Sequence, residues 1–254
     1  MIVTMKDIWA LPMIRKNFPD DAEKRGFNLH FVESLERKDL LNAVPELKSK
    51  GIASVVGLGG GQAIDVAKFF AWKLGCTLFQ VPTALTVDAP WGHRAAVRDD
   101  GVVRYVGYAV PEAIYIDYDV LQSAPKELIL SGIGDVLCFH TAHWDWKLAD
   151  KKGKAGNFPF DKAMADQAYG VLENLLTHSK DIKALNDKGI KALVTALRYG
   201  GVLYLSDPAD QPLKVKRERE RERERERRAN DKINGIKHTN KSKSHTHTHT
   251  HTQS

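Results

Sequence analysis

The chain has 254 residues, enough for one large or two small domains, and its formal net charge of +6 comes from 38 Lys+Arg and 32 Asp+Glu. Residues 214–254 carry 13 of the basic and 6 of the acidic side chains, which leaves residues 1–213 nearly neutral with 25 and 26. Nucleic-acid binding through the folded part is therefore not expected. No apolar run is long enough to predict a membrane span, and two cysteines favour a reducing compartment, the cytoplasm, over a disulfide framework.

The first readable elements are a short strand and an amphipathic helix, whereas residues 1–27 are hard to interpret. Residues 29–32 predict a strand, and apolar side chains recur at helical spacing through 33–50. Pro45 lies inside that segment and is expected to kink or split the helix. Gly51 is expected to act as its C-cap.

A glycine-rich turn follows, and the rest of the chain is organised around it. Residues 53–68 read ASVVGLGGGQAIDVAK, in which a β-branched run meets four glycines and then a helix-period segment over 62–74. Glycines let a ligand approach the main chain closely, and the N-terminus of a helix attracts anions. The pattern predicts a diphosphate site, with an ordinary strand-to-helix turn as the alternative.

Further strands alternate with these helices. They are predicted at 77–81, in a hairpin at 93–97 and 102–106 around an Asp-Asp-Gly turn, and at 113–116. Such alternation indicates an α/β domain with a parallel sheet, in which ligands bind beyond the carboxyl ends of the strands. The glycine turn, the loop at 83–88 and Asp117 all follow strand ends, so we expect them to converge on one site.

From residue 125 the pattern is helical, with helices expected over 135–149, 160–176 and 189–205. We therefore predict an α/β domain at 1–124, a partial all-helical domain at 125–206, and a low-complexity tail at 207–254.

The tail contains two alternating repeats, RERERERERER at 217–227 and HTHTHTHT at 245–252. Both read like translated dinucleotide repeats, and neither offers the apolar periodicity that a core requires. We interpret the tail as a solvated segment, disordered or helical, that replaces the end of a longer protein. The alternatives are weak metal binding by the histidines and polyanion binding by the basic tract. Such truncation would leave the apolar faces at 172–176 and 192–205 uncovered.

Three motifs in this order resemble the iron-containing alcohol dehydrogenase superfamily. Residues 59–68, GGGQAIDVAK, resemble its GGGxxxDxxK turn, and Val81-Pro82-Thr83 with Thr86 and Asp88 resembles its VPTxxSxD signature. The GIGD at 132–135, followed by DWKLA at 145–149, looks most like sn-glycerol-1-phosphate dehydrogenases, with glycerol dehydrogenase and 3-dehydroquinate synthase as relatives. The resemblance implies a Rossmann-like nucleotide-binding domain followed by a helical, dehydroquinate synthase-like domain.

The resemblance also implies site residues. NAD or NADP would place its diphosphate on the turn and its nicotinamide beside Thr83 and Thr86. Asp88 would contact substrate hydroxyls, and Asp135 would touch the substrate and be the first ligand of a catalytic zinc or iron. Such a metal stabilises an alkoxide and polarises a ketone. The turn residues implied in cofactor binding are Gly59, Gly60, Gly61, Gln62, Ala63 and Asp65. The family's next cofactor-contacting serine falls at Gly92.

The histidine ligands of the family have no match here. After Asp135, residues up to 213 contain only His140, His143 and His178, none in the Gly-Ser-Glu-His context that the family uses. His140 and His143 lie roughly 140° and 80° around a helix from Asp135, a poor fit to one site. We therefore expect an incomplete metal site.

Other polar side chains have plainer interpretations. Asp117 and Asp119 are expected to cap a helix at 120–123. Lys68 is expected to orient the turn or pair with a carboxylate. Arg94 or Arg98 could favour a phosphate, with ordinary hairpin charges as the alternative.

The sequence thus predicts a metal- and NAD(P)-dependent oxidoreductase that interconverts a small alcohol, such as glycerol phosphate or a related polyol, and its ketone. A homo-oligomer is one assembly that such a protein could form. The alternative is a catalytically incomplete, nucleotide-binding fragment or pseudoenzyme of the same family.

Overall fold

The computed structural model describes residues 1–21, 24–156 and 158–205, with side chains up to residue 200. These residues lie within one compact unit, Met1–Asp207. The predicted tail at 207–254 falls outside the described residues, and the boundaries at 124 and 206 stay predictions. No helix in the described ranges is both long and apolar enough to cross a membrane. Cys76 and Cys138 are free thiols.

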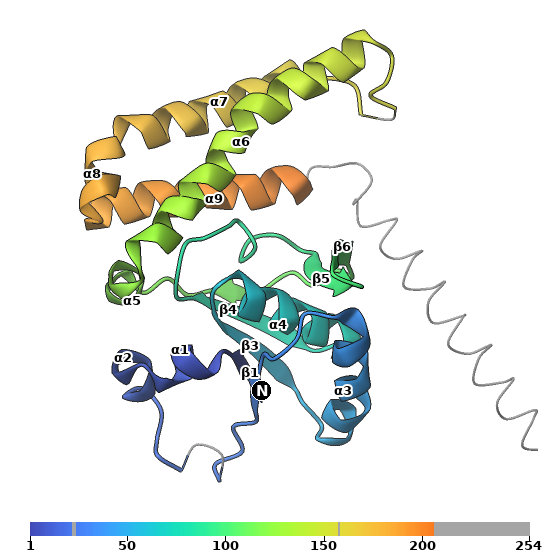
Figure 1. Cartoon of the computed structure of the whole chain (residues 1–254), viewed down its shortest axis with the longest axis vertical. Coiled ribbons are helices and arrows are strands. Elements are labelled where there is room, and N and C mark those ends of the chain that lie inside the picture. The colour runs from blue at the N-terminus through green and yellow to red at the C-terminus, as the bar shows by residue number, and fades with distance from the viewer. Residues whose placement is uncertain (22–23, 157, 206–254) are drawn as a thin grey trace, which may run out of the picture. The chain divides into compact units, whose positions relative to one another are not determined.

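A five-stranded parallel sheet forms the centre of the first half (Figure 1). Its strands run in the order β2-β1-β3-β4-β7, and every neighbouring pair is parallel. Their bounds are β1 Ile2–Thr4, β2 Leu29–Phe31, β3 Ser54–Gly59, β4 Thr77–Pro82 and β7 Ala113–Ile114. The predicted α/β architecture is confirmed.

Strand β1 is one of the elements that the sequence pattern did not show. Val3 is fully buried, and the strand pairs with both β2 and β3, so it lies inside the sheet. Three residues are too few for an alternating pattern, and a strand covered on both faces has no polar side to alternate with.

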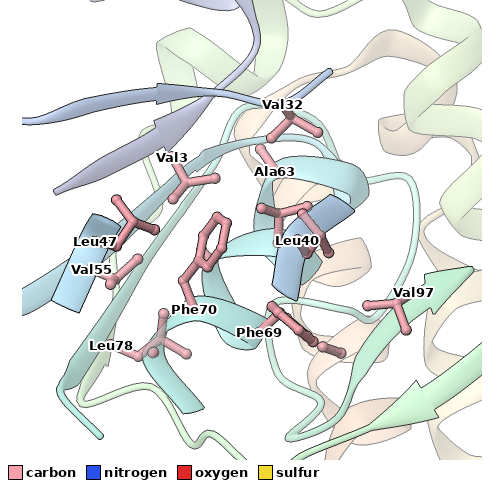
Figure 2. Close-up of a cluster of buried hydrophobic side chains, with 14 of the residues drawn as sticks. Val3, Val32, Leu40, Leu47, Val55, Ala63, Phe69, Phe70, Leu78 and Val97 are labelled. Atoms are coloured by element: carbon pink, nitrogen blue, oxygen red, sulfur yellow. The ribbon is translucent and has the colours of Figure 1, made fainter. Parts of the chain in front are cut away.

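Helices cover both faces of the sheet. On one face, α3 (Arg37–Ser49) and α4 (Gly61–Leu74) enclose a core around Phe69 and Phe70, both fully buried (Figure 2). On the other face, α1 (Lys6–Ala10), α2 (Pro12–Arg15) and α5 (Tyr118–Ser123) contribute to a smaller cluster. Of the two expectations for Pro45, a kink or a split, the split is wrong, because α3 is one continuous helix.

A separate antiparallel hairpin joins β5 (Ala95–Asp99) to β6 (Val102–Val106), as predicted. Asp100 and Gly101 both have positive φ angles, 51° and 78°, at its turn. Glu36 accepts the backbone N–H groups of both turn residues, and Arg37 pairs with Asp99 at 2.8 Å. The hairpin is thereby fastened to the start of α3.

The second half is helical, as expected, and consists of α6 (Lys126–Lys151), α7 (Lys162–Thr177), α8 (Ser179–Ala184) and α9 (Asp187–Leu205) after α5 (Figure 1). Leu172, Leu175, Leu193 and Leu197 are at most 6% exposed. Of the faces expected to be uncovered, these four leucines are instead buried in one cluster together with α6, whereas Leu176 is 55% exposed and the side chains at 201–205 lie outside the described residues. Leu85 and Trp91, from the loop after β4, complete that cluster.

Candidate active site

Strand β3 ends at Gly59 and α4 begins at Gly61, so the turn between them is a single residue, Gly60. The first hydrogen bond of the helix runs from the N–H of Ile64 to the carbonyl of Gly60, at 3.2 Å. The backbone N–H groups that precede it have no partner within the helix, and no side chain caps them. The positive end of the dipole of this fourteen-residue helix therefore lies at the carboxyl edge of the sheet.

The glycines have different reasons for lacking a side chain. Gly59 needs its freedom because its φ is +150° and a Cβ there would lie 2.9 Å from that of Ala63. Gly60 has an ordinary extended backbone, with φ −80° and ψ −171°, and a Cβ built on it meets nothing within 4 Å. Neither conformation nor packing explains Gly60. Open space at a helix N-terminus is what the approach of a phosphate group requires.

The loop after β4 lies against this turn. The N–H of Thr83 donates to the carbonyl of Gly59 at 3.0 Å, and Thr83 is 5% exposed. A Cβ built on Gly61 would lie 3.1 Å from Val87 and 3.8 Å from the hydroxyl of Thr86. The structure thus brings the two predicted threonines beside the predicted diphosphate turn.

Asp88 and Asp135, the two predicted substrate carboxylates, are also brought together. The backbone N–H of Asp88 donates to Oδ2 of Asp135 at 2.9 Å. Burial and then the negative charge of Asp135 raise the pKa of Asp88 to about 6. Burial likewise raises the pKa of Asp135, and the N–H of Asp88 opposes that rise.

Helix α6 approaches the loop closely at Gly132. A Cβ on Gly132 would overlap the carbonyl of Leu85, whereas one on Gly134 would meet nothing within 4 Å. Ser131 supports the same contact, because its hydroxyl lies 3.3 Å from the carbonyl of Thr86 and can donate to it. No pattern in the sequence predicted this docking, since both glycines belong to one motif.

Asp65 and Lys68 form a buried ion pair one turn into α4, at 2.8 Å. The interpretation of Lys68 as the partner of a carboxylate is confirmed. Asp65 and Lys68 are 9% and 2% exposed. Burial raises the pKa of Asp65, and the ammonium group of Lys68 opposes that rise. The carboxylate of Asp65 thus has a partner within the protein, while its predicted contact with a dinucleotide stays a prediction.

The remaining candidates make other contacts. Asp117 accepts the N–H of Val120 at 3.1 Å and caps α5, as its plainer interpretation predicted. His140 and His143 pack against the ring of Tyr169, at 5.8 and 4.6 Å between ring centroids. In the part of the chain that the structure describes, no group of three or more His, Cys, Asp or Glu side chains is arranged to hold a metal. Asp135 with Asp88 therefore does not fit a metal centre on its own.

Comparisons with known proteins identify what this chain is similar to. Residues 2–125 match a family model described as iron-containing alcohol dehydrogenase. The chain is 40% identical over 146 residues to a glycerol-1-phosphate dehydrogenase [NAD(P)+] from Metallosphaera sedula. The aligned region covers 55% of this chain and 41% of that protein. It is 34% identical over 198 residues to the protein of the same name from Sulfurisphaera tokodaii, covering 75% and 55%.

Solved structures share the fold at lower sequence identity. A probable glycerol dehydrogenase from Sinorhizobium meliloti has a TM-score of 0.59 at 20% identity, over 80% of this chain and 58% of that one. An iron-containing alcohol dehydrogenase from Corynebacterium glutamicum has a TM-score of 0.61 at 15% identity, over 80% and 54%. The chain thus spans about half the length of the relatives that it matches.

Proposed function

We propose that this chain, whose residues 2–125 belong to the iron-containing alcohol dehydrogenase family, binds NAD or NADP and supports hydride transfer between the dinucleotide and a small alcohol or its ketone. The observation that carries the proposal is the conformation and surroundings of Gly60. It caps α4 without a side chain, in an ordinary conformation and beside open space, at the carboxyl end of a parallel strand.

Each residue around the turn then has a physical role. The N–H groups that open α4, at Gly61, Gln62 and Ala63, would hold the diphosphate oxygens. Thr86, on the loop beside the turn, would offer its hydroxyl to the nicotinamide end. When bound, the dinucleotide supplies the hydride acceptor or donor. Asp88 and Asp135 would accept hydrogen bonds from the hydroxyl groups of a polyol and so orient it.

We propose glycerol phosphate or a related polyol as the substrate class, because the curated relatives carry the name glycerol-1-phosphate dehydrogenase. The family name also implies a divalent metal, which would stabilise charge on the reacting oxygen. Among residues 1–21, 24–156 and 158–205, no group of three or more His, Cys, Asp or Glu side chains is arranged to hold a metal, so no third ligand completes a centre with Asp135 and Asp88. We therefore assign no step to a metal.

The lack of a third metal ligand among the described residues supports a second candidate, a chain that binds a dinucleotide without turning over an alcohol. The two candidates share the glycine turn and differ in the carboxylate pair. Both predict cofactor binding, and only the first predicts oxidation of glycerol 1-phosphate.

Calorimetric titration of the full chain with NADH and NADPH tests the shared claim. Gly60→Val should weaken binding by at least about tenfold, since the new side chain fills the space that the diphosphate needs. Gly170→Val is the matched control, because Gly170 is exposed on α7 and a Cβ there also meets nothing within 4 Å. Unchanged affinity in Gly60→Val, with the melting temperature of the parent, would refute binding at this turn. Absorbance at 340 nm with glycerol 1-phosphate, with and without added Zn²⁺ or Fe²⁺, then separates the two candidates.

A further inference from the structure

Lys68 is a buried cation whose contacts reach beyond its own helix. Its ammonium group lies 2.8 Å from Oδ1 of Asp65 and donates to the carbonyl oxygens of Ala89, at 3.0 Å, and Arg94, at 2.5 Å. Two of its three N–H donors are used on these carbonyl groups, and the contact with Asp65 is an ion pair. Burying a charge is costly unless it is paired and hydrogen-bonded, so this group is committed to these contacts.

The two carbonyl groups belong to one loop. Ala89 directly follows Asp88, and Arg94 directly precedes β5, so Lys68 holds both ends of the intervening segment. Asp65 holds a third point, because it accepts the backbone N–H of Ala96. Two side chains of α4 therefore fasten residues 89–96 to the helix whose N-terminus forms the glycine turn.

The fastened segment in turn holds Asp88. The carbonyl of Asp88 accepts the N–H groups of Trp91 and Gly92 at 2.9 and 3.2 Å. These bonds close a tight turn at the start of the fastened segment. The N–H of Asp88 reaches Asp135 on α6. A continuous path of contacts thus runs from α4 through Lys68 and Ala89 to the carboxylate pair.

We propose that Asp65 and Lys68 act as a positioning clamp, which sets the place of Asp88 relative to the dinucleotide turn. The expected effect of this positioning on turnover rests on the proposed function, whereas the contacts of the clamp do not. Lys68 touches neither cofactor nor substrate in this assignment. It fixes the loop on which the substrate carboxylate lies, and the same helix carries the cofactor turn.

Amide hydrogen exchange on the full chain tests the clamp without reference to activity. Lys68→Met removes the ammonium group but keeps the length of the side chain, and should speed exchange at Trp91 and Gly92 by at least about tenfold. The double variant Asp65→Asn with Lys68→Met leaves no unpaired buried charge, so it remains informative if the single variant fails to fold. The matched control is Glu46→Gln with Lys50→Met, which removes an exposed ion pair of the same 2.8 Å length from α3.

Three outcomes decide the inference. Faster exchange confined to residues 88–96 in both clamp variants, with the amides of α4 still protected, supports it. Unchanged exchange in that loop, or equal acceleration across the whole chain, overturns it. Where the parent oxidises glycerol 1-phosphate, Lys68→Met should lower kcat by at least about tenfold while the KM for the dinucleotide changes less than about threefold. A parent that binds no dinucleotide refutes the proposed function and leaves the exchange result standing.

Discussion

The backbone N–H of Asp88 donates to Oδ2 of Asp135 across a separation of 47 residues, at 2.9 Å. This bond joins the loop after β4 to α6, so that the α/β part and the helices share one site. Two carboxylates so close in a partly buried place repel each other when both are ionised. Burial first, and then the negative charge of Asp135, raise the pKa of Asp88 to about 6.

This pKa predicts how stability depends on pH. The folded chain holds the proton of Asp88 up to about pH 6, whereas the unfolded chain releases it near the ordinary value of 3.8. The folded state therefore binds more protons in this window, and the free energy of unfolding should fall as pH rises from 4 to 7. Asp88→Asn lacks this titrating group. As pH rises from 4 to 7, its free energy of unfolding should therefore increase relative to that of the parent by on the order of 1–2 kcal/mol, a figure reduced for partial solvent exposure.

Urea denaturation across that range measures the effect. Asp145→Asn, exposed on the same helix as Asp135, is the control and should follow the parent. Parallel stability curves for Asp88→Asn and the parent would show that Asp88 titrates normally.

The two glycines of the GIGD motif should differ sharply on substitution. Gly132→Ala would place a methyl group against the carbonyl of Leu85, so α6 must move away from the loop, at a cost of about 1–3 kcal/mol. Gly134→Ala meets open space and should be neutral or stabilising by up to about 1 kcal/mol, because alanine favours the helix. Thermal melting of both variants checks the contrast, and equal melting temperatures would contradict the close approach.

Gly92→Ser restores the hydroxyl that the resembling family has at this position. The nearest atoms to a Cβ there are the carbonyl oxygen of Ala89, at 3.8 Å, and Nζ of Lys68, at 4.0 Å, so the side chain fits without strain. The free energy of unfolding should change by less than about 0.5 kcal/mol. Affinity for NADH should rise by about two- to tenfold if the hydroxyl forms a hydrogen bond to the cofactor. Calorimetric titration decides this, with Gly92→Ala as the control that fits equally but cannot donate.

Phe70 should carry a large share of the stability of the first half. It is fully buried between α4 and the sheet and lies 4.7 Å from the ring of His30, between centroids. Phe70→Ala should therefore cost about 3–5 kcal/mol. Phe27 is 40% exposed, and Phe27→Ala should cost clearly less. Chemical denaturation of the two variants compares them, and similar losses would place Phe70 outside the main core.

Much of the site could be predicted because its signals are local. The strand, the turn and the helix at 54–74 follow from a β-branched run, adjacent glycines and helical periodicity, all within about twenty residues. The same holds for the hairpin and for Asp117 as an N-cap, since turn and capping chemistry depends on neighbours three or four residues away. Strand β1 was missed because three buried residues carry no period.

By itself, the sequence determined the α/β order of elements, the position of the glycine turn, and the near-neutral charge of residues 1–213. These properties depend on backbone preferences over short windows and on simple counts. Only the tertiary structure decided that Lys68 holds carbonyl groups 21 and 26 residues away, that Asp88 meets Asp135, and that Leu172 and Leu175 of α7 share a cluster with Leu193 and Leu197 of α9. Such contacts arise where packing brings distant segments within hydrogen-bond reach, and no local pattern along the chain encodes that distance.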